Sequence, residues 1–230
     1  DKKREAQKWW LSKSLENFKT DLDRFNISLE ILSDDEIKVF SNIKKKDDVT
    51  VYWNKVYEPS FLLFDKKLSD TLDSKNINFK IFKGNLLNES HDIKKNDNTP
   101  YKVFTPFWKI AEKFYLDREF NRKQKIKITK KKINFLDQSI NIESLLQKKK
   151  WYSNFEKCWD PSEETALDNI KYFIENNLSD YGENRDTPNI EGTSKISPYL
   201  AFGQIHIETI WEECQKVKIK GTGYRKYINE

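Results

Sequence analysis

Gly192-Thr-Ser-Lys-Ile-Ser-Pro-Tyr-Leu-Ala-Phe-Gly203 is the stretch of this 230-residue chain on which the interpretation of the fold depends. Ser197 followed by Pro198 is typical of a helix start. Gly192 would let the backbone come close to a ligand. The turn also supplies hydroxyl groups and one positive charge, from Thr193, Ser194, Lys195 and Ser197. Such donors beside a helix N-terminus suit a diphosphate, although an ordinary capped helix behind a loop is the simpler explanation on local chemistry alone.

The residues on both sides of this stretch predict further helices. Asp160, Pro161 and Glu163 fit the N-cap, N1 and N3 positions of a capping box. An apolar stripe at helical spacing follows, made of Leu167, Ile170, Phe173, Ile174 and Leu178. Residues 205–217 predict one more helix. We therefore expect the chain beyond residue 155 to be all-α.

The first hundred residues alternate between helical and strand periodicity. Helices are predicted over residues 10–22, 36–43, 62–72 and 106–114, the second with a capping box of Ser33 and Glu36. Strands are predicted over residues 27–31, 49–53 and 77–81. This alternation indicates an α/β domain with a Rossmann-like parallel sheet covered by helices. Because the chain starts on a helix and contains no methionine, we expect an internal piece of a longer protein, with the first strand missing.

A lysine-rich stretch separates the two halves. It includes Arg122-Lys-Gln-Lys-Ile-Lys-Ile-Thr-Lys-Lys-Lys132, in which no aromatic residue is interleaved. A solvated connection between domains is the simpler interpretation, and an arm that binds nucleic acid is the alternative. We therefore predict an α/β domain over residues 1–117, a linker over 118–154 and the beginning of a helical domain over 155–230.

Composition excludes several classes of protein. The 42 basic and 37 acidic residues leave a net charge of +5, which permits a nucleic-acid partner without requiring one. No apolar run approaches the ~20 residues that cross a bilayer, and no signal peptide is visible, so we expect a soluble, cytoplasmic protein. The sequence has no Gly-x-Gly-x-x-Gly motif or P-loop, and its two histidines lack metal-ligand spacing, so we expect no metal site. Cys158 and Cys214 are expected to be buried thiols.

Four segments, in order along the chain, resemble motifs of the photolyase/cryptochrome family. Residues 192–203 are similar to its FAD-binding signature, Gly-Thr-Ser-Arg-Leu-Ser-Pro-x-Leu-x-x-Gly. Val51-Tyr-Trp-Asn54 with Tyr57-Glu-Pro59 resembles the segment after a strand of the family's antenna domain. Pro100-Tyr-Lys-Val-Phe-Thr-Pro-Phe-Trp108 resembles the motif that closes that domain. Trp159-Asp-Pro-Ser-Glu163 resembles the start of the helical FAD-binding domain, with serine in place of glycine.

The resemblance implies a cofactor and a set of contact residues. FAD contacts are implied for Tyr181, Thr193, Ser194, Lys195, Ile196, Ser197 and Tyr227. Arg185 is implied to meet the DNA backbone, and Glu230 is implied to be the catalytic residue that lies against the damaged bases. Lys195 stands where the family usually has an arginine. A lysine keeps the positive charge but lacks the planar guanidinium that binds an anion through two hydrogen bonds. Ser60-Phe61 stand where folate-binding relatives carry Asn-Glu, so the resemblance leaves the identity of a second antenna chromophore open.

The resemblance further implies the activity of a deoxyribodipyrimidine photo-lyase. In that family, reduced FAD absorbs blue light and passes an electron to a cyclobutane pyrimidine dimer that has been flipped out of UV-damaged DNA. We expect the parent protein to be a monomer, and the 230-residue chain alone to hold no FAD firmly and to repair no DNA. A cryptochrome, which shares fold and FAD but does not repair, is the alternative. A third hypothesis, an α/β nucleotide-binding protein with a helical appendage, predicts no flavin.

Overall fold

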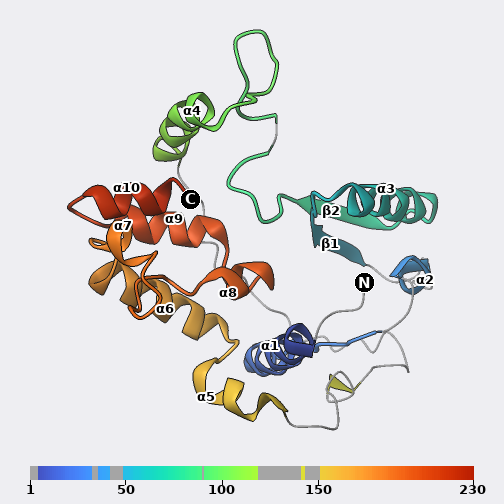
Figure 1. Ribbon diagram of the computed structural model, residues 1–230. Helices are drawn as coiled ribbons and strands as arrows, with labels where there is room; N and C mark the ends of the chain where they lie inside the picture. The colour runs from blue at the N-terminus through green and yellow to red at the C-terminus, as the bar shows by residue number, and fades with distance from the viewer. Residues whose placement is uncertain (1–4, 33–35, 42–48, 90, 119–140, 143–150) are drawn as a thin grey trace. The chain divides into compact units, whose positions relative to one another are not determined.

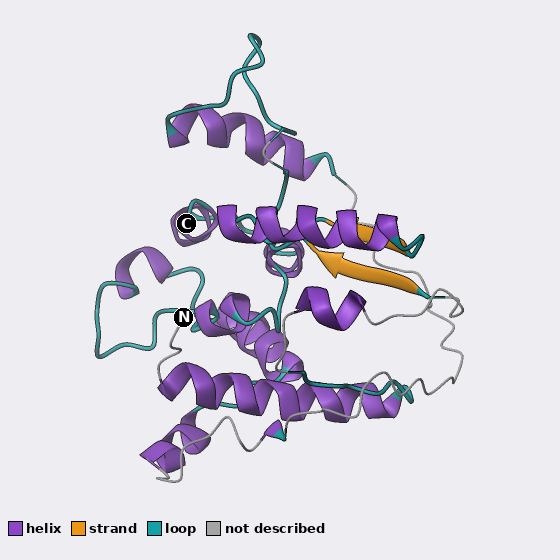
Figure 2. Cartoon of the chain, turned by 90° about the vertical axis from the view of Figure 1, so that its right-hand side faces the viewer, coloured by secondary structure: helices purple, strands orange, loops and turns teal. Residues whose placement is uncertain are grey.

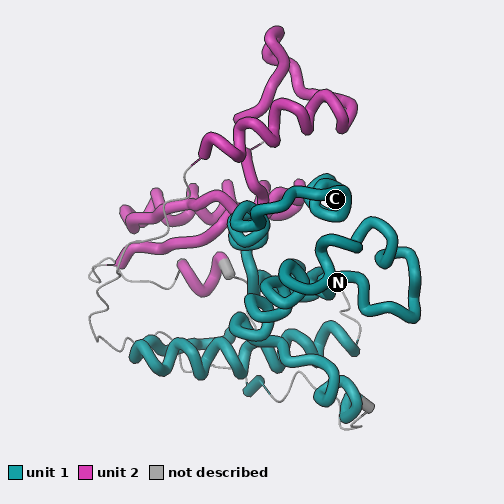
Figure 3. Tube along the Cα trace, turned by 90° about the vertical axis from the view of Figure 1, so that its left-hand side faces the viewer, with its two compact units in different colours: residues 1–32, 119–230 teal, residues 33–118 magenta. Residues whose placement is uncertain are grey.

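The chain folds into two compact units. The computed structural model describes residues 5–32, 36–41, 49–89, 91–118, 141–142 and 151–230. One unit comprises residues 1–32 with 119–230, and the other comprises residues 33–118 (Figure 3). We call the first the helical unit and the second the α/β unit.

The α/β unit is built on a parallel pair of strands joined by a crossover helix (Figure 2). Its elements are α2 (Glu36–Ser41), β1 (Thr50–Asn54), α3 (Pro59–Ser74), β2 (Asn78–Phe82) and α4 (Phe104–Leu116). The strands pair from Thr50 opposite Asn78 to Asn54 opposite Phe82. Parallel strands need such a crossover, and α3 covers the pair through a core of Val51, Leu68, Leu72 and Ile77. This βαβ arrangement confirms the predicted Rossmann-like α/β class.

The helical unit contains all the remaining described elements. They are α1 (Glu5–Arg24), the 3-10 helix η2 (Trp151–Asn154), α5 (Phe155–Cys158), α6 (Glu163–Asn176), α7 (Tyr181–Asn184), α8 (Ser197–Ala201), α9 (Ile207–Gln215) and α10 (Thr222–Ile228). The apolar stripe of α6 lies in the core through Ala166, Ile170 and Phe173. Figure 1 shows α10 beside α7 and α9, which α10 contacts. The predicted all-α character of this part is confirmed.

The first helix belongs to the helical unit, although the elements that follow it in sequence belong to the α/β unit. Trp9 and Trp10 of α1 are buried in the same core as α6 and α9. The indole Nε1 of Trp10 donates a hydrogen bond of 2.8 Å to Oε1 of Gln204. The Trp10 ring meets those of Trp159 and Tyr199 edge to face, at centroid distances of 5.5 and 5.0 Å. Trp9 and Trp10 therefore pack in the helical unit and not in the α/β domain that was predicted over residues 1–117, because periodicity identifies a helix but not its packing partner.

Two local predictions need correction. Residues 27–31 form neither strand nor helix. The N-cap of α6 is Ser162, whose Oγ accepts a hydrogen bond of 3.1 Å from the backbone N–H of Thr165, whereas Asp160 was predicted. Asp160 instead accepts hydrogen bonds from the hydroxyls of Ser162 and Thr165, so it supports the cap. The predicted capping box at Ser33 lies outside the described residues.

The predicted domain limits differ from the compact units. The expected α/β domain began at residue 1, whereas residues 1–32 pack with 119–230. Most of the predicted linker 118–154, including all of its lysine-rich stretch, lies outside the described residues. The division of the sequence at residues 117 and 154 therefore stays a prediction.

Candidate functional site

The predicted site residues come together where α7, α10 and the turn before α8 meet. We call residues 192–197 the hydroxyl turn. Two glycines allow this approach. A Cβ on Gly192 would lie 2.7 Å from the carbonyl oxygen of Asn184, and a Cβ on Gly223 would lie 2.2 Å from that of Leu178. Gly192 was predicted to admit a ligand, but in the structure its missing side chain admits the end of α7.

The hydroxyl turn presents polar groups outward and one apolar group inward. Thr193, Lys195 and Ser197 are exposed, whereas Ile196 is buried in the core. Lys195 has a φ of +52°, a conformation that residues other than glycine rarely adopt. Its Nζ lies 2.6 Å from Oε1 of Glu191, and this contact lowers the pKa of the Glu191 carboxyl. Such backbone strain often marks a ligand site, so the turn is a candidate for binding an anion.

An aromatic cluster lies behind the turn. The ring of Tyr181 packs edge to face against Phe173 and Tyr227, at centroid distances of 5.6 and 5.1 Å. A side-chain hydrogen bond joins Tyr227 to Ser194 of the turn. Burial raises the pKa of the Tyr227 hydroxyl, while the bond to Ser194 opposes this shift. Burial therefore keeps the Tyr227 hydroxyl neutral, beside Ser194 of the turn.

A charged group borders the aromatic cluster at the ends of α7 and α10. Arg185 follows the last turn of α7, and its guanidinium carbon lies 5.6 Å from the centre of the Tyr181 ring. Its Nη1 pairs with Oε1 of Glu230, and its Nε lies 3.2 Å from Oδ1 of Asp186. The Tyr181 hydroxyl donates to Oε2 of Glu230. Three predicted site residues, Tyr181, Arg185 and Glu230, thus form one network.

The structure also shows site residues that the sequence did not reveal. Phe173 supports Tyr181 and Tyr227, but its place in the apolar stripe of α6 indicated only core packing. Glu191 holds Lys195, and their spacing of four residues was the available signal. Gly223 was visible only as one of two glycines in Gly221-Thr-Gly223, a pattern common in loops.

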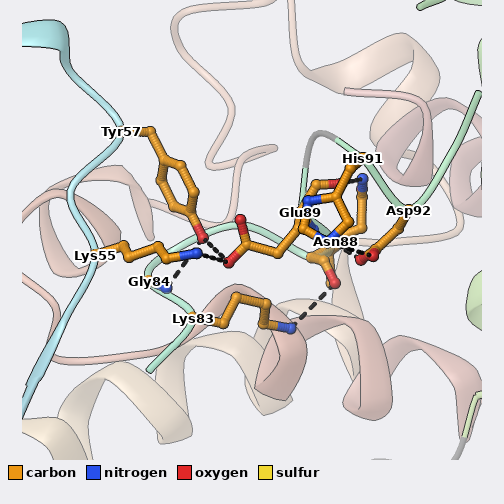
Figure 4. A network of polar contacts seen from close by, with 9 residues as sticks. Lys55, Tyr57, Lys83, Gly84, Asn88, Glu89, His91 and Asp92 are labelled. Atoms are coloured by element: carbon orange, nitrogen blue, oxygen red, sulfur yellow. Dashed lines mark hydrogen bonds and ion pairs between the residues drawn. The ribbon is translucent and has the colours of Figure 1, made fainter. Parts of the chain in front are cut away.

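The α/β unit has a separate polar network after its strands (Figure 4). The Tyr57 hydroxyl accepts a hydrogen bond of 3.1 Å from the backbone N–H of Gly84 and donates one of 3.0 Å to Oε1 of Glu89. Lys55 lies 3.2 Å from the same oxygen of Glu89. Burial raises the pKa of the Tyr57 hydroxyl. Lys55 and Gly84 follow the carboxyl ends of β1 and β2, and open α/β sheets bind ligands at this edge. The network holds together the loops that follow the two strands.

The described residues set two further limits. Within them, no group of three or more His, Cys, Asp or Glu side chains is arranged to hold a metal ion. No helix in the described part of the chain combines the length and apolar character that a membrane crossing requires.

Cys214 is buried as predicted, but Cys158 is exposed at the end of α5, contrary to expectation.

Comparison with known proteins places this geometry in context. The family model for DNA photolyase matches residues 1–127. A deoxyribodipyrimidine photo-lyase of Agrobacterium fabrum is 31% identical over 207 residues, which are 90% of this chain and 43% of the relative. Cryptochrome-2 of Arabidopsis thaliana is 24% identical over 219 residues, which are 93% of this chain and 36% of that protein.

Solved structures show the same fold. A bacterial class III photolyase from Agrobacterium tumefaciens matches with a TM-score of 0.82 and 28% identity, over 98% of this chain and 47% of that one. An archaeal photolyase from Sulfolobus tokodaii, solved with two FAD molecules, matches with a TM-score of 0.68 and 19% identity, over 99% of this chain and 46% of that one. The chain spans less than half the length of these relatives.

The fold and the site define a chain of the photolyase/cryptochrome type, with a parallel α/β unit and a helical unit that carries the hydroxyl turn. The family match covers more than half of the sequence and runs across both units. The chain belongs to the DNA photolyase family.

Proposed function

We propose that the protein containing this chain is a deoxyribodipyrimidine photo-lyase, which uses light to split cyclobutane pyrimidine dimers in DNA. The observation that carries the proposal is the 31% identity to the Agrobacterium fabrum photo-lyase over 90% of the chain. Membership of the DNA photolyase family supports it and leaves no support for an unrelated nucleotide-binding protein. A monomeric state and a cytoplasmic location are part of the same proposal.

The proposed cofactor is FAD, held by the hydroxyl turn and the aromatic cluster. The Sulfolobus tokodaii relative was solved with two FAD molecules, one implicated in light harvesting, which supports FAD and a second chromophore in this family. When bound and reduced, FAD would supply the electron that opens the dimer. The proposed contacts are Tyr181, Thr193, Ser194, Lys195, Ile196, Ser197 and Tyr227.

The donors of the hydroxyl turn fit a diphosphate. Thr193, Lys195 and Ser197 are exposed and offer two hydroxyls and one cation over five residues. An anion at Lys195 would replace Glu191 as its partner. The Ser194 hydroxyl already interacts with Tyr227, so only its remaining donor or acceptor position would be available to the diphosphate. Ile196 lies in the core, so only its backbone is available to the cofactor.

Arg185 and Glu230 are the proposed DNA contacts. A guanidinium at the end of α7 suits a backbone phosphate, which it can bind through two parallel hydrogen bonds. Glu230 is proposed to accept a hydrogen bond from the extruded pyrimidine dimer, and it is the proposed catalytic residue. The network of Arg185, Glu230 and Tyr181 supports this assignment, because it brings both DNA contacts beside the proposed cofactor contacts.

The proposal is tested by purifying the protein that carries this chain and recording its absorption spectrum. We expect flavin absorbance, and repair of an oligonucleotide with one thymine dimer under blue light but not in darkness. Lys195→Gln should weaken flavin retention about tenfold by removing a charged contact to phosphate, whereas Lys195→Arg should preserve retention. Lys171→Gln, an equal charge change on an exposed position of α6, serves as the control. A protein that stays colourless after reconstitution with flavin refutes the proposal.

A cryptochrome is the second candidate, favoured by the similarity to Arabidopsis cryptochrome-2 over 93% of the chain. Both candidates predict flavin absorbance, so only the repair assay separates them. Flavin binding without light-dependent loss of the dimer would establish the cryptochrome.

A further inference from the structure

We propose that Glu230 and Arg185 hold each other in the absence of DNA, and that a backbone phosphate replaces Glu230 on Arg185 when DNA binds. The exchange frees one oxygen of Glu230 for the damaged base. This inference rests on the proposed function, which assigns both residues to DNA. It adds that the two contacts form together, so that recognition of the lesion depends on a phosphate having bound.

Arg185 is partly exposed and pairs with two acidic side chains. It pairs with Glu230 through Nη1 and with Asp186 through Nε, and its side chain remains 29% exposed. A guanidinium prefers planar anions that accept two hydrogen bonds, and phosphate offers them as well as carboxylate does. An approaching phosphate can therefore replace Glu230 and keep the guanidinium paired with an anion, while the released carboxylate keeps its hydrogen bond from Tyr181.

Glu230 has both of its oxygens engaged. Oε1 pairs with Arg185, and Oε2 accepts the hydrogen bond from the Tyr181 hydroxyl. A pyrimidine N–H must therefore compete with one of these two partners for a lone pair.

The two partners of Glu230 differ in how easily they move. The Tyr181 side chain lies in the core, between Phe173 and Tyr227. Arg185 is a long, partly exposed side chain at the C-cap of the short helix α7. The ion pair between Glu230 and Arg185 is therefore the contact that breaks when DNA binds. Tyr181 then keeps the carboxylate in place through Oε2, while Oε1 becomes available as an acceptor.

The test measures the affinity of the purified protein for a fluorescent, undamaged oligonucleotide at one fixed salt concentration. Glu230→Gln removes the charge that competes for Arg185, so we expect binding to tighten about two- to fivefold, the range of a partly exposed ion pair. Glu230→Asp keeps the charge but shortens the side chain, and should tighten binding in the same way. Glu183→Gln changes the net charge equally at an exposed position of α7 that does not pair with Arg185, and should have a smaller effect.

A double-mutant cycle gives the decisive result. Arg185→Ala should weaken DNA binding more in the Glu230→Gln background than in the wild type, because the wild-type protein must break an ion pair to use Arg185. An equal cost in both backgrounds overturns the exchange. Tightening by Glu183→Gln as large as that by Glu230→Gln also overturns it, since net charge alone would then explain both. Circular dichroism of each variant verifies folding, and Glu230→Asp serves if Glu230→Gln does not fold.

The exchange and the proposed function can fail separately. A wild-type protein that binds no DNA and repairs no dimer contradicts the proposed function. A protein that repairs dimers but shows equal costs in the cycle contradicts only the exchange.

Discussion

Gly192 determines how closely the hydroxyl turn packs against α7. An alanine there would place its Cβ 2.5 Å from the Cβ of Asn184 and 2.7 Å from the backbone carbon and oxygen of that residue. Backbone cannot move aside as a flexible side chain can, so Gly192→Ala should destabilise the fold by about 1–3 kcal/mol and loosen flavin binding. Chemical denaturation measures the change. Gly221→Ala is the control, because no heavy atom beyond its chain neighbours lies within 4 Å of its added Cβ, and its cost should stay below about 1 kcal/mol, from a poorer N-cap of α10.

The two thiols should differ in reactivity because of burial. Burial raises the pKa of the Cys214 thiol to about 12, so at pH 8 it is protonated and not nucleophilic. Cys158 is exposed. The native protein should therefore react rapidly with a disulfide reagent at one cysteine of this chain, and at both after denaturation. Raising the pH towards 10 should leave Cys214 unreactive while the fold persists. Rapid reaction of the native Cys158→Ser variant, in which Cys214 is the remaining cysteine of this chain, would contradict the burial.

The residue types of the site could be predicted, but not the directions of their side chains. The sequence indicated Ser194, Lys195 and Ile196 as neighbours in one ligand-binding turn. In the structure Ile196 enters the core, Ser194 is bonded to Tyr227, and Lys195 pairs with Glu191. These differences depend on the positive φ of Lys195, which spacing alone does not reveal because glycine, not lysine, is the usual residue in that conformation.

At the scale of elements, the start of α6 depends on Ser162. Its Oγ accepts a hydrogen bond of 3.1 Å from the N–H of Thr165, while Asp160 binds the hydroxyls of both residues. Ser162→Ala should lower the free energy of unfolding by about 1 kcal/mol, because one N–H at the helix start loses its partner. Ser162→Asn should restore most of it, as asparagine is an equally good cap. An unchanged free energy of unfolding in Ser162→Ala would contradict this cap.

Strands were harder to predict than helices for a physical reason. A helix satisfies its hydrogen bonds within a few residues, and α3 and α6 were therefore visible in the apolar spacing. A strand needs hydrogen bonds to a second strand, and the alternation of apolar residues in one segment does not show whether such a strand is present. Val51 and Phe79 lie opposite each other in a parallel pair. Residues 27–31 have the same alternation but form no strand, and their burial does not alternate, since Ile27 is exposed whereas Leu29, Glu30 and Ile31 are all half-buried.

At the scale of the whole molecule, the class of fold could be predicted, but not which parts pack together. The α/β and helical halves follow from the change in periodicity near residue 155. The membership of α1 in the helical unit does not, because contacts such as that between Trp10 and Gln204 join residues 194 positions apart. Apolar helices look alike in sequence whichever core they enter. The four motifs that resemble the family, in their order along the chain, allowed the function to be predicted. They did not show which core each helix enters.

The packing of α1 leads to a prediction about long-range stability. Trp10 lies against Tyr199, two residues beyond the end of the hydroxyl turn, whereas Trp53 belongs to the α/β unit, where its indole bonds to Asp65 at 3.0 Å. Trp10→Ala should destabilise the helical unit by about 3–5 kcal/mol and accelerate flavin release, because the cavity lies beside the site. Trp53→Ala should destabilise the α/β unit and leave the flavin release rate near that of the wild type. Denaturation curves and flavin fluorescence at a denaturant concentration where both variants remain folded measure these effects. Equal flavin release from the two variants would mean that α1 does not support the site.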